Sequence, residues 1–181
     1  MNSLDLVIAK ISETFLTEAK NSLSLIEDMA AMGRYMAESY SGRIFIELIQ
    51  NADDCHSTRI CFSKVGDDLF FANNGTVFCP DDIRAISRSG SSMKKRGESI
   101  GYRGVGFKST TALSSDIYIH SGGSTFSFSK NIAAERLCLR PNQVPTVRIP
   151  FLVSDLDLQI KTEIQKFINQ GYTTIFVFKN A

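Results

Sequence analysis

The chain has 181 residues, of which 43% are hydrophobic and 22% charged, and its formal net charge is +1. A chain of this length and composition is expected to form one globular domain that buries about 70% of its unfolded surface. The near-neutral charge excludes a uniformly basic surface that would bind nucleic acid through phosphate contacts. Nucleic-acid binding is therefore not indicated for this domain.

The cysteines and the hydropathy profile exclude several further classes. The four cysteines, Cys55, Cys61, Cys79 and Cys138, lack the C-x-x-C spacing of a zinc site, and the chain has two histidines. We expect reduced thiols and a cytoplasmic location. Neither a secretory leader nor an uncharged stretch of about 18 residues is present, so no membrane partner is expected.

Helices are predicted where apolar residues recur at helical spacing. Residues 4–32 predict two helices or one broken helix that is interrupted at Gly33, and residues 36–53 predict another with a boundary at Ser41 and Gly42. Shorter helical patterns occupy residues 81–87 and 107–113. An amphipathic helix is predicted for residues 156–169.

Strands are predicted where β-branched and aromatic residues cluster between turn residues. These segments are residues 58–63, 68–72, 116–120, 125–129, 146–149 and 173–179, with a hairpin turn at 65–67. Helices and strands mix without strict βαβ alternation. The predicted fold class is α+β, a two-layer α/β sandwich with a mostly antiparallel mixed sheet covered on one face by helices.

The most informative segment is a polar stripe within residues 43–54. Glu47, Asn51 and Asp54 are spaced i, i+4 and i+7, so they lie within roughly 60° of one another on a helix. Apolar residues flank this stripe and are expected to be buried: Ile44, Phe45, Leu48 and Ile49. A carboxylate and a carboxamide one turn apart suit a hydrated cation and an attacking water.

A second signal is the glycine-rich segment 101–109, which leads into a predicted helix start. Glycines let backbone N–H groups approach an anion closely, and a helix amino terminus adds positive potential, so this segment predicts polyphosphate binding. A purely steric glycine turn is the alternative. A P-loop is disfavoured because Phe107 separates Gly106 from Lys108 and because no buried strand precedes Gly101.

Taken together, residues 47–54, residues 73–75 and residues 104–109 resemble, in order and spacing, a known nucleotide-binding domain. This is the GHKL or Bergerat fold shared by gyrase, the ninety-kilodalton heat-shock chaperones, histidine kinases and MutL. The resemblance covers most of residues 35–179 and is strongest to the sacsin and NO VEIN-like branch. It implies a single domain over residues 1–181, with a helical amino-terminal extension at 1–34.

The resemblance assigns roles to the polar stripe. Glu47 would be the general base that polarises the water attacking the γ-phosphate, and Asn51 would hold Mg²⁺ against the phosphates. Asp54 would order the pocket floor or its waters, whereas Asp53 would be a solvated neighbour or an N-box accessory. The alternative for Glu47 is an ordinary amphipathic-helix carboxylate.

Nucleotide contacts are implied for the other motifs. The phosphates would contact Gly101, Gly104, Val105, Gly106, Phe107 and Lys108, and a solvated, outward-facing Lys108 is the alternative. Asn73 matches the family's adenine-binding aspartate and Gly75 the following glycine. The Asn73 carboxamide can accept from adenine N6 or donate to guanine O6, so the base is not fixed. Thr173 matches the family's threonine near the base, and two threonines that simply start a strand are the alternative.

Residues 88–100 are polar and basic and are predicted to act as an ATP lid. Lys94, Lys95 and Arg96 would contact the phosphates on closure, and a solvated basic loop is the alternative reading of each.

The predicted function is Mg²⁺-dependent binding and slow hydrolysis of ATP, coupled to lid closure, in a chaperone-like or defence-related module. Related ATPases often need a cation from a following domain and often pair through amino-terminal segments. We therefore expect a homodimer or further domains of a longer chain as partners, an unknown protein client, and weak activity in isolation. A nonhydrolytic nucleotide-sensing module is the main alternative. A histidine kinase is disfavoured by the positions of His56 and His120, and a purely structural domain remains open.

Overall fold

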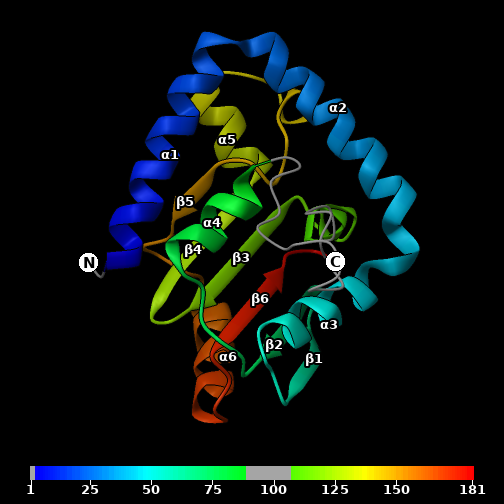
Figure 1. The fold of residues 1–181 in the computed structure, drawn as a ribbon, viewed down its shortest axis with the longest axis vertical. Coiled ribbons are helices and arrows are strands. Elements are labelled where there is room, and N and C mark those ends of the chain that lie inside the picture. Colours follow the sequence, from blue (N-terminus) through cyan, green and yellow to red (C-terminus); the bar gives the residue numbers. More distant parts are fainter. Residues whose placement is uncertain (1–2, 89–106) are drawn as a thin grey trace.

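The computed structural model describes residues 3–88 and 107–181, and within these ranges helices pack against one antiparallel sheet (Figure 1). The helices are α1 (Ser3–Asn21), α2 (Leu23–Tyr40), α3 (Ile44–Asp54), α4 (Pro80–Ser87), α5 (Lys130–Leu137) and α6 (Leu158–Asn169). Short 3-10 helices are η1 (Ser41–Arg43), η2 (Phe107–Ala112) and η3 (Pro141–Gln143). None of the helices in these ranges is both long enough and apolar enough to cross a membrane.

The sheet of the described residues has six strands in the order β1-β2-β6-β3-β4-β5, and each neighbouring pair is antiparallel. The strands are β1 (Ile60–Val65), β2 (Asp68–Asn73), β3 (Asp116–Ser121), β4 (Ser124–Ser129), β5 (Pro150–Leu152) and β6 (Thr174–Phe178). The carboxyl-terminal strand β6 lies in the middle of the sheet, between β2 and β3. The predicted α/β sandwich with an antiparallel sheet is confirmed.

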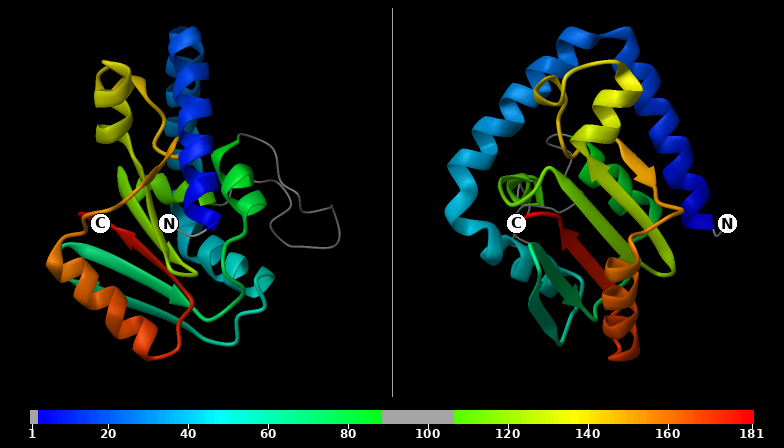
Figure 2. Two further views of the ribbon diagram at one scale, coloured as in Figure 1. Left: turned by 90° about the vertical axis from the view of Figure 1, so that its left-hand side faces the viewer. Right: turned by 180° about the vertical axis from the view of Figure 1, so that it is seen from behind.

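Alternation along the strands creates two apolar faces. Phe71 and Phe176 belong to a large core that also contains residues of α1, α3, α4 and α5. Their neighbours Phe70 and Val177 point to the opposite face, where α6 covers β2 and β6. Figure 2 shows α6 on one side of the sheet and α1, α3 and α4 on the other. The helices therefore do not cover one face alone, as predicted, because α6 covers the second face of the sheet.

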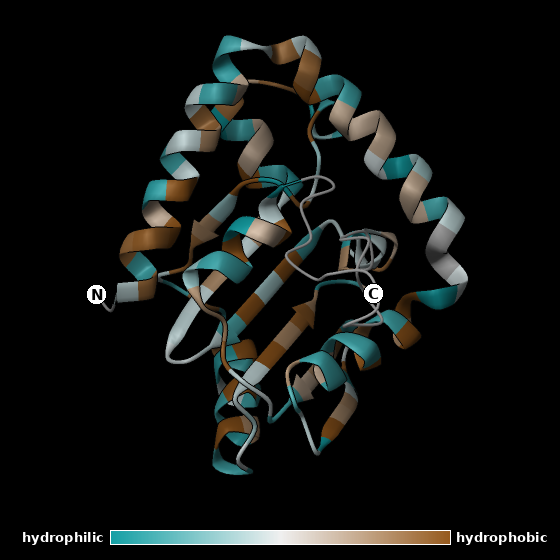
Figure 3. Ribbon diagram, in the orientation of Figure 1, coloured by the Kyte–Doolittle hydropathy of each residue, from teal (hydrophilic) through white to brown (hydrophobic). Residues whose placement is uncertain are grey.

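Helix α1 is amphipathic and lies across the larger core. Its buried residues Leu4, Ile8, Ile11 and Phe15 follow helical spacing, and Figure 3 shows hydrophobic and hydrophilic residues alternating along it. Helix α2 follows after Ser22 and runs away from α1 toward η1 (Figure 1).

Three local predictions were wrong. Helix α2 continues through Gly33, because one interior glycine costs a helix only about 1 kcal/mol and packing of α2 against η2 and η3 offsets it. Residues 146–149 form no strand, since their apolar side chains are buried in an irregular segment and pairing begins at Pro150. Helix α5 was missed, although Ser129 is its N-cap and accepts a hydrogen bond from the Ile132 N–H (3.2 Å).

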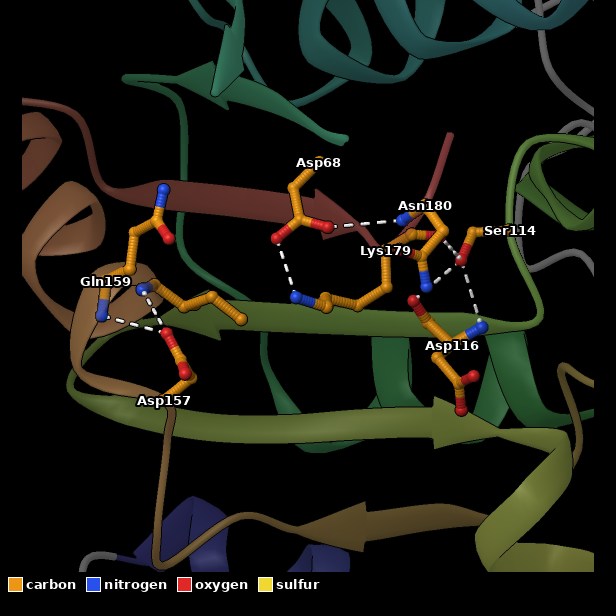
Figure 4. Close-up of polar contacts among 8 residues, drawn as sticks. Asp68, Ser114, Asp116, Asp157, Gln159, Lys179 and Asn180 are labelled. Atoms are coloured by element: carbon orange, nitrogen blue, oxygen red, sulfur yellow. Dashed lines mark hydrogen bonds and ion pairs between the residues drawn. The ribbon is translucent and has the colours of Figure 1, made fainter. Parts of the chain in front are cut away.

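Polar side chains tie the carboxyl end of β6 to its neighbours (Figure 4). The Lys179 ammonium lies 2.6 Å from Asp68, which also accepts the Asn180 N–H at 3.1 Å. The Ser114 hydroxyl is within hydrogen-bonding distance of the carbonyls of Asp116 (2.9 Å) and Lys179 (2.6 Å). These contacts fix the register of the central strands, whose opposite ends carry the candidate site.

Candidate functional site

Helix α3 carries the predicted polar stripe. Ile44, Leu48 and Ala52 are its buried face, and Glu47, Asn51 and Asp54 lie half-buried along one flank. The predicted burial of Phe45 and Ile49 was wrong, because they are 50% and 44% exposed on the other flank. The stripe therefore borders the core, as a ligand-facing row must, without being sealed inside it.

Backbone capping ends α3 at a defined residue. The Ser57 N–H donates to the Ala52 carbonyl (3.0 Å) and the His56 N–H to the Asp53 carbonyl (2.8 Å). His56 adopts the left-handed conformation with φ +58°, so the pattern is a Schellman motif. His56 thus terminates the helix, and Asp54 is held in its last turn.

The segment after β2 packs directly on this helix end. The Thr76 N–H donates to the Cys55 carbonyl (2.9 Å). A Cβ on Gly75 would lie 2.6 Å from that carbonyl oxygen, closer than real Cβ atoms come. Glycine is required here by this close approach, which brings the turn at 73–75 against α3.

The two asparagines of the turn have different roles. The Asn74 amide oxygen accepts the N–H groups of Thr58 (3.0 Å) and Arg59 (2.9 Å), which fastens the loop between α3 and β1. The Asn73 amide oxygen accepts the buried Gly75 N–H at 3.1 Å. That bond fixes which end of the Asn73 amide is oxygen. Its nitrogen remains a donor, and its oxygen has a second lone pair.

Asn73 lies in a row of buried polar residues across the sheet. It pairs directly with Thr174, and Thr174 with Ser121, so the three side chains share one face. The hydroxyls of Thr174 and Ser121 are 2.7 Å apart, and the Ser121 hydroxyl accepts the Phe78 N–H at 3.0 Å. All three residues are buried, and they lie on the face of the sheet that packs against α3.

The sequence assigned the base-side threonine to Thr173, and the structure gives its hydroxyl a different environment. Thr173 donates to the Gly75 carbonyl (2.6 Å), and its N–H donates to the Asn73 carbonyl (2.9 Å). Thr173 therefore clamps the turn from the side. Thr174 is the threonine that shares a face with Asn73, and strand register is the signal that identifies it.

Phe107 and Lys108 begin η2 at the other end of α3. The Phe107 ring lies 5.7 Å from that of Phe176 and 6.5 Å from that of Phe128, so it anchors η2 in the core. Burial, aided by the positive charge of Arg148, lowers the pKa of Lys108 to about 8. An anion beside this ammonium group would raise that pKa again.

The ends of α3 thus meet two different parts of the candidate site. Both η1 and α3 pack against η2, which carries Lys108, whereas the carboxyl end of α3 packs against the Asn73 turn. Glu47 and Asp54 are seven positions apart on the helix, which is a rise of about 10 Å. The stripe therefore runs from the Lys108 region toward Asn73.

Asn51 fits a magnesium site that is completed by a ligand. Mg²⁺ takes oxygen donors and is commonly held by one or two protein groups together with phosphates and waters. Asn51 carries an amide oxygen and lies on the half-buried stripe. In residues 3–88 and 107–181, no cluster of three or more His, Cys, Asp or Glu side chains is placed to hold a metal.

Several predicted site residues lie outside the described ranges. These are Gly101, Gly104, Val105 and Gly106 of the glycine segment, and all of the predicted lid except Arg88, including Lys94, Lys95 and Arg96. Their predicted phosphate contacts stay predictions.

Part of the chain is similar to a known protein. No protein-family model matches the chain. It is 34% identical over 128 residues to Protein NO VEIN of Arabidopsis thaliana, and this match covers 62% of the chain but 5% of the relative. The chain thus spans a small part of the relative's length. The similarity agrees with the branch suggested by the motifs.

Proposed function

We propose that this chain is a GHKL-type domain that binds ATP with Mg²⁺ and hydrolyses it slowly. The observation that carries the proposal is the position of the α3 stripe, between the Lys108 region of η2 and the buried Asn73 turn. A nucleotide lying along this stripe would place its base toward Asn73 and its phosphates toward Glu47 and Lys108.

Each described residue then has a chemical task. Glu47 accepts the proton of the attacking water, and Asn51 presents its amide oxygen to the metal. Asn73 reads the base edge with an amide whose orientation is fixed by Gly75. Bound Mg²⁺ supplies neutralisation of the phosphate charge during transfer.

Membership of the sacsin and NO VEIN-like branch is part of the proposal. It is supported by the motif order, the antiparallel sandwich and the partial similarity to NO VEIN. Within that branch, nucleotide binding would drive conformational change in a longer, cytoplasmic protein with a chaperone-like or defence-related role. The amino-terminal helices would take part in pairing or in contacts with further domains.

Calorimetry with ATP, ADP and GTP in the presence of Mg²⁺ tests binding, and phosphate release tests hydrolysis. Glu47→Ala should retain ATP binding and lose phosphate release about 100-fold or more. Asn51→Ala should weaken the Mg²⁺-dependent part of binding. The matched control is Asp53→Ala, since Asp53 is an exposed carboxylate on the same helix and should change neither quantity.

The result separates the two functional readings. Binding without phosphate release above background in wild type and Glu47→Ala alike would replace the enzyme with a nonhydrolytic nucleotide-sensing module. Failure of every nucleotide to bind would leave a structural domain.

A further inference from the structure

Arg148 joins three parts of the fold, and sequence reasoning did not single it out. Its guanidinium lies 3.9 Å from the centroid of the Phe15 ring on α1. One terminal nitrogen donates to the Ser87 carbonyl at the end of α4 (3.1 Å), and the other to the Glu18 carboxylate (3.0 Å). The Arg148 side chain is 15% exposed, so part of it reaches solvent.

Several buried polar atoms on the described segments that meet at this contact have no hydrogen-bond partner. Among residues 3–88 and 107–181, the buried side-chain atoms without a hydrogen-bond partner are Arg148 Nε, Ser87 Oγ, Thr146 Oγ1 and Ser127 Oγ. Arg148 and Ser87 touch each other, and Thr146 lies two residues from Arg148 on the same segment. Ser87 and Thr146 are 0% and 4% exposed. Buried polar groups are normally paired, so three unpartnered atoms on two contacting segments call for a partner.

The chemistry of these atoms defines the ligand class. The guanidinium N–H is a donor only, and the serine and threonine hydroxyls can both donate. A single ligand that satisfies more than one of them must offer several acceptor oxygens. A tetrahedral oxyanion does so, whereas a metal ion or another donor does not.

Charge points to the same class. Lys108 and Arg88 both act on Arg148 as neighbouring positive charges, and Glu18 is the carboxylate that opposes them. Among the described residues, these three cations stand against one carboxylate. The mutual repulsion of Lys108 and Arg148 would be relieved by a bound anion.

We propose that Arg148 and Ser87 form a binding site for a phosphate group, with Lys108 as a neighbouring cation. The phosphate is either inorganic phosphate or the terminal phosphate of a nucleotide, and only the second source rests on the proposed function. In that case the chain itself supplies a cation to the phosphates, in addition to any that a following domain provides.

The test measures binding of inorganic phosphate to the full chain by calorimetry at constant ionic strength, with chloride as the reference anion. Ser87→Ala removes one unpartnered hydroxyl without touching the Arg148 contact to the Ser87 carbonyl. It should weaken phosphate binding about 10-fold. Lys108→Met should weaken it by a similar factor. Ser127→Ala is the matched control, because Ser127 Oγ is also buried and unpartnered but lies on β4, and it should leave affinity within about twofold.

Competition with ATP and ADP identifies the source. Competition by ATP and not by ADP, with Ser87→Ala weakening ATP alone, supports the terminal phosphate. Phosphate binding that neither nucleotide changes supports a free-phosphate site. If phosphate binds but no nucleotide binds at all, the proposed function is refuted and the phosphate site is retained. Phosphate that binds no better than chloride, or an equal loss in Ser127→Ala and Ser87→Ala, overturns the site. If ATP nevertheless binds, the proposed function survives that result.

Discussion

Substitution of Gly75 by alanine tests the close approach that joins the Asn73 turn to α3. The added Cβ would lie 2.6 Å from the Cys55 carbonyl oxygen and 3.0 Å from the Cys55 Cβ. The oxygen belongs to the backbone, so it cannot rotate away, and it already accepts the Thr76 N–H at 2.9 Å. The turn and the helix end must therefore separate by several tenths of an ångström.

The magnitude follows from three contributions. Overpacking of this kind costs about 1–3 kcal/mol, and weakening of the Thr76 hydrogen bond adds up to about 1 kcal/mol. Alanine has less conformational entropy than glycine in the unfolded chain, which stabilises the folded variant by about 0.4–1 kcal/mol. The net expectation for Gly75→Ala is a loss of about 2 kcal/mol, which corresponds to a Tm lower by about 4–8 °C for a chain of this size.

Urea denaturation followed by circular dichroism measures this loss, and calorimetry measures ATP affinity in the same samples. Gly33→Ala is the control, since no atom lies within 4 Å of its added Cβ and it lies inside α2. It should raise stability by about 0.5–1 kcal/mol. If Gly75→Ala proves as stable as wild type and binds ATP equally, the turn does not abut α3 as described.

Three further predictions concern the same region. His56→Gly should stabilise the protein by about 1 kcal/mol in urea denaturation, because His56 holds φ +58° without the freedom of glycine; a destabilised variant would contradict the capping described. Asn73→Ala should lose about 1–2 kcal/mol by leaving the Gly75 N–H unpaired, whereas Asn73→Asp, which keeps an acceptor, should lose less; equal losses would disagree. For Lys108, whose pKa is lowered from 10.5 to about 8, the unfolded chain binds more protons between these values, so the free energy of unfolding should rise with pH there. Lys108→Met should flatten that rise by about 1–3 kcal/mol between pH 8 and 10.5, and identical pH profiles would refute the burial of this ammonium group.

Local sequence patterns predicted most elements but not their limits. The spacing of Ile44, Leu48 and Ala52 is helical, and α3 forms over that segment. Phe45 and Ile49 are equally apolar, yet they are exposed, because the arrangement of neighbouring elements decides which flank of α3 meets the core. The alternating segment 146–149 resembles a strand, and its apolar side chains are buried without forming one.

The candidate site was predictable where one segment carries it. Glu47, Asn51 and Asp54 follow from helical spacing alone. Thr174 depends on antiparallel register across β2 and β6, which a local pattern does not contain. Arg148 depends on three segments far apart in the chain, and no local motif marks it.

The central claim is that the α3 stripe and the Asn73 turn enclose one nucleotide with its Mg²⁺. Calorimetric titration of the wild-type chain with ATP and Mg²⁺, repeated on Asn51→Ala, tests it most directly. We predict one saturable site per chain in wild type, with an affinity that depends on Mg²⁺ and weakens by about 10-fold or more in Asn51→Ala. The absence of binding at millimolar ATP, or binding that Asn51→Ala leaves unchanged, would contradict the claim.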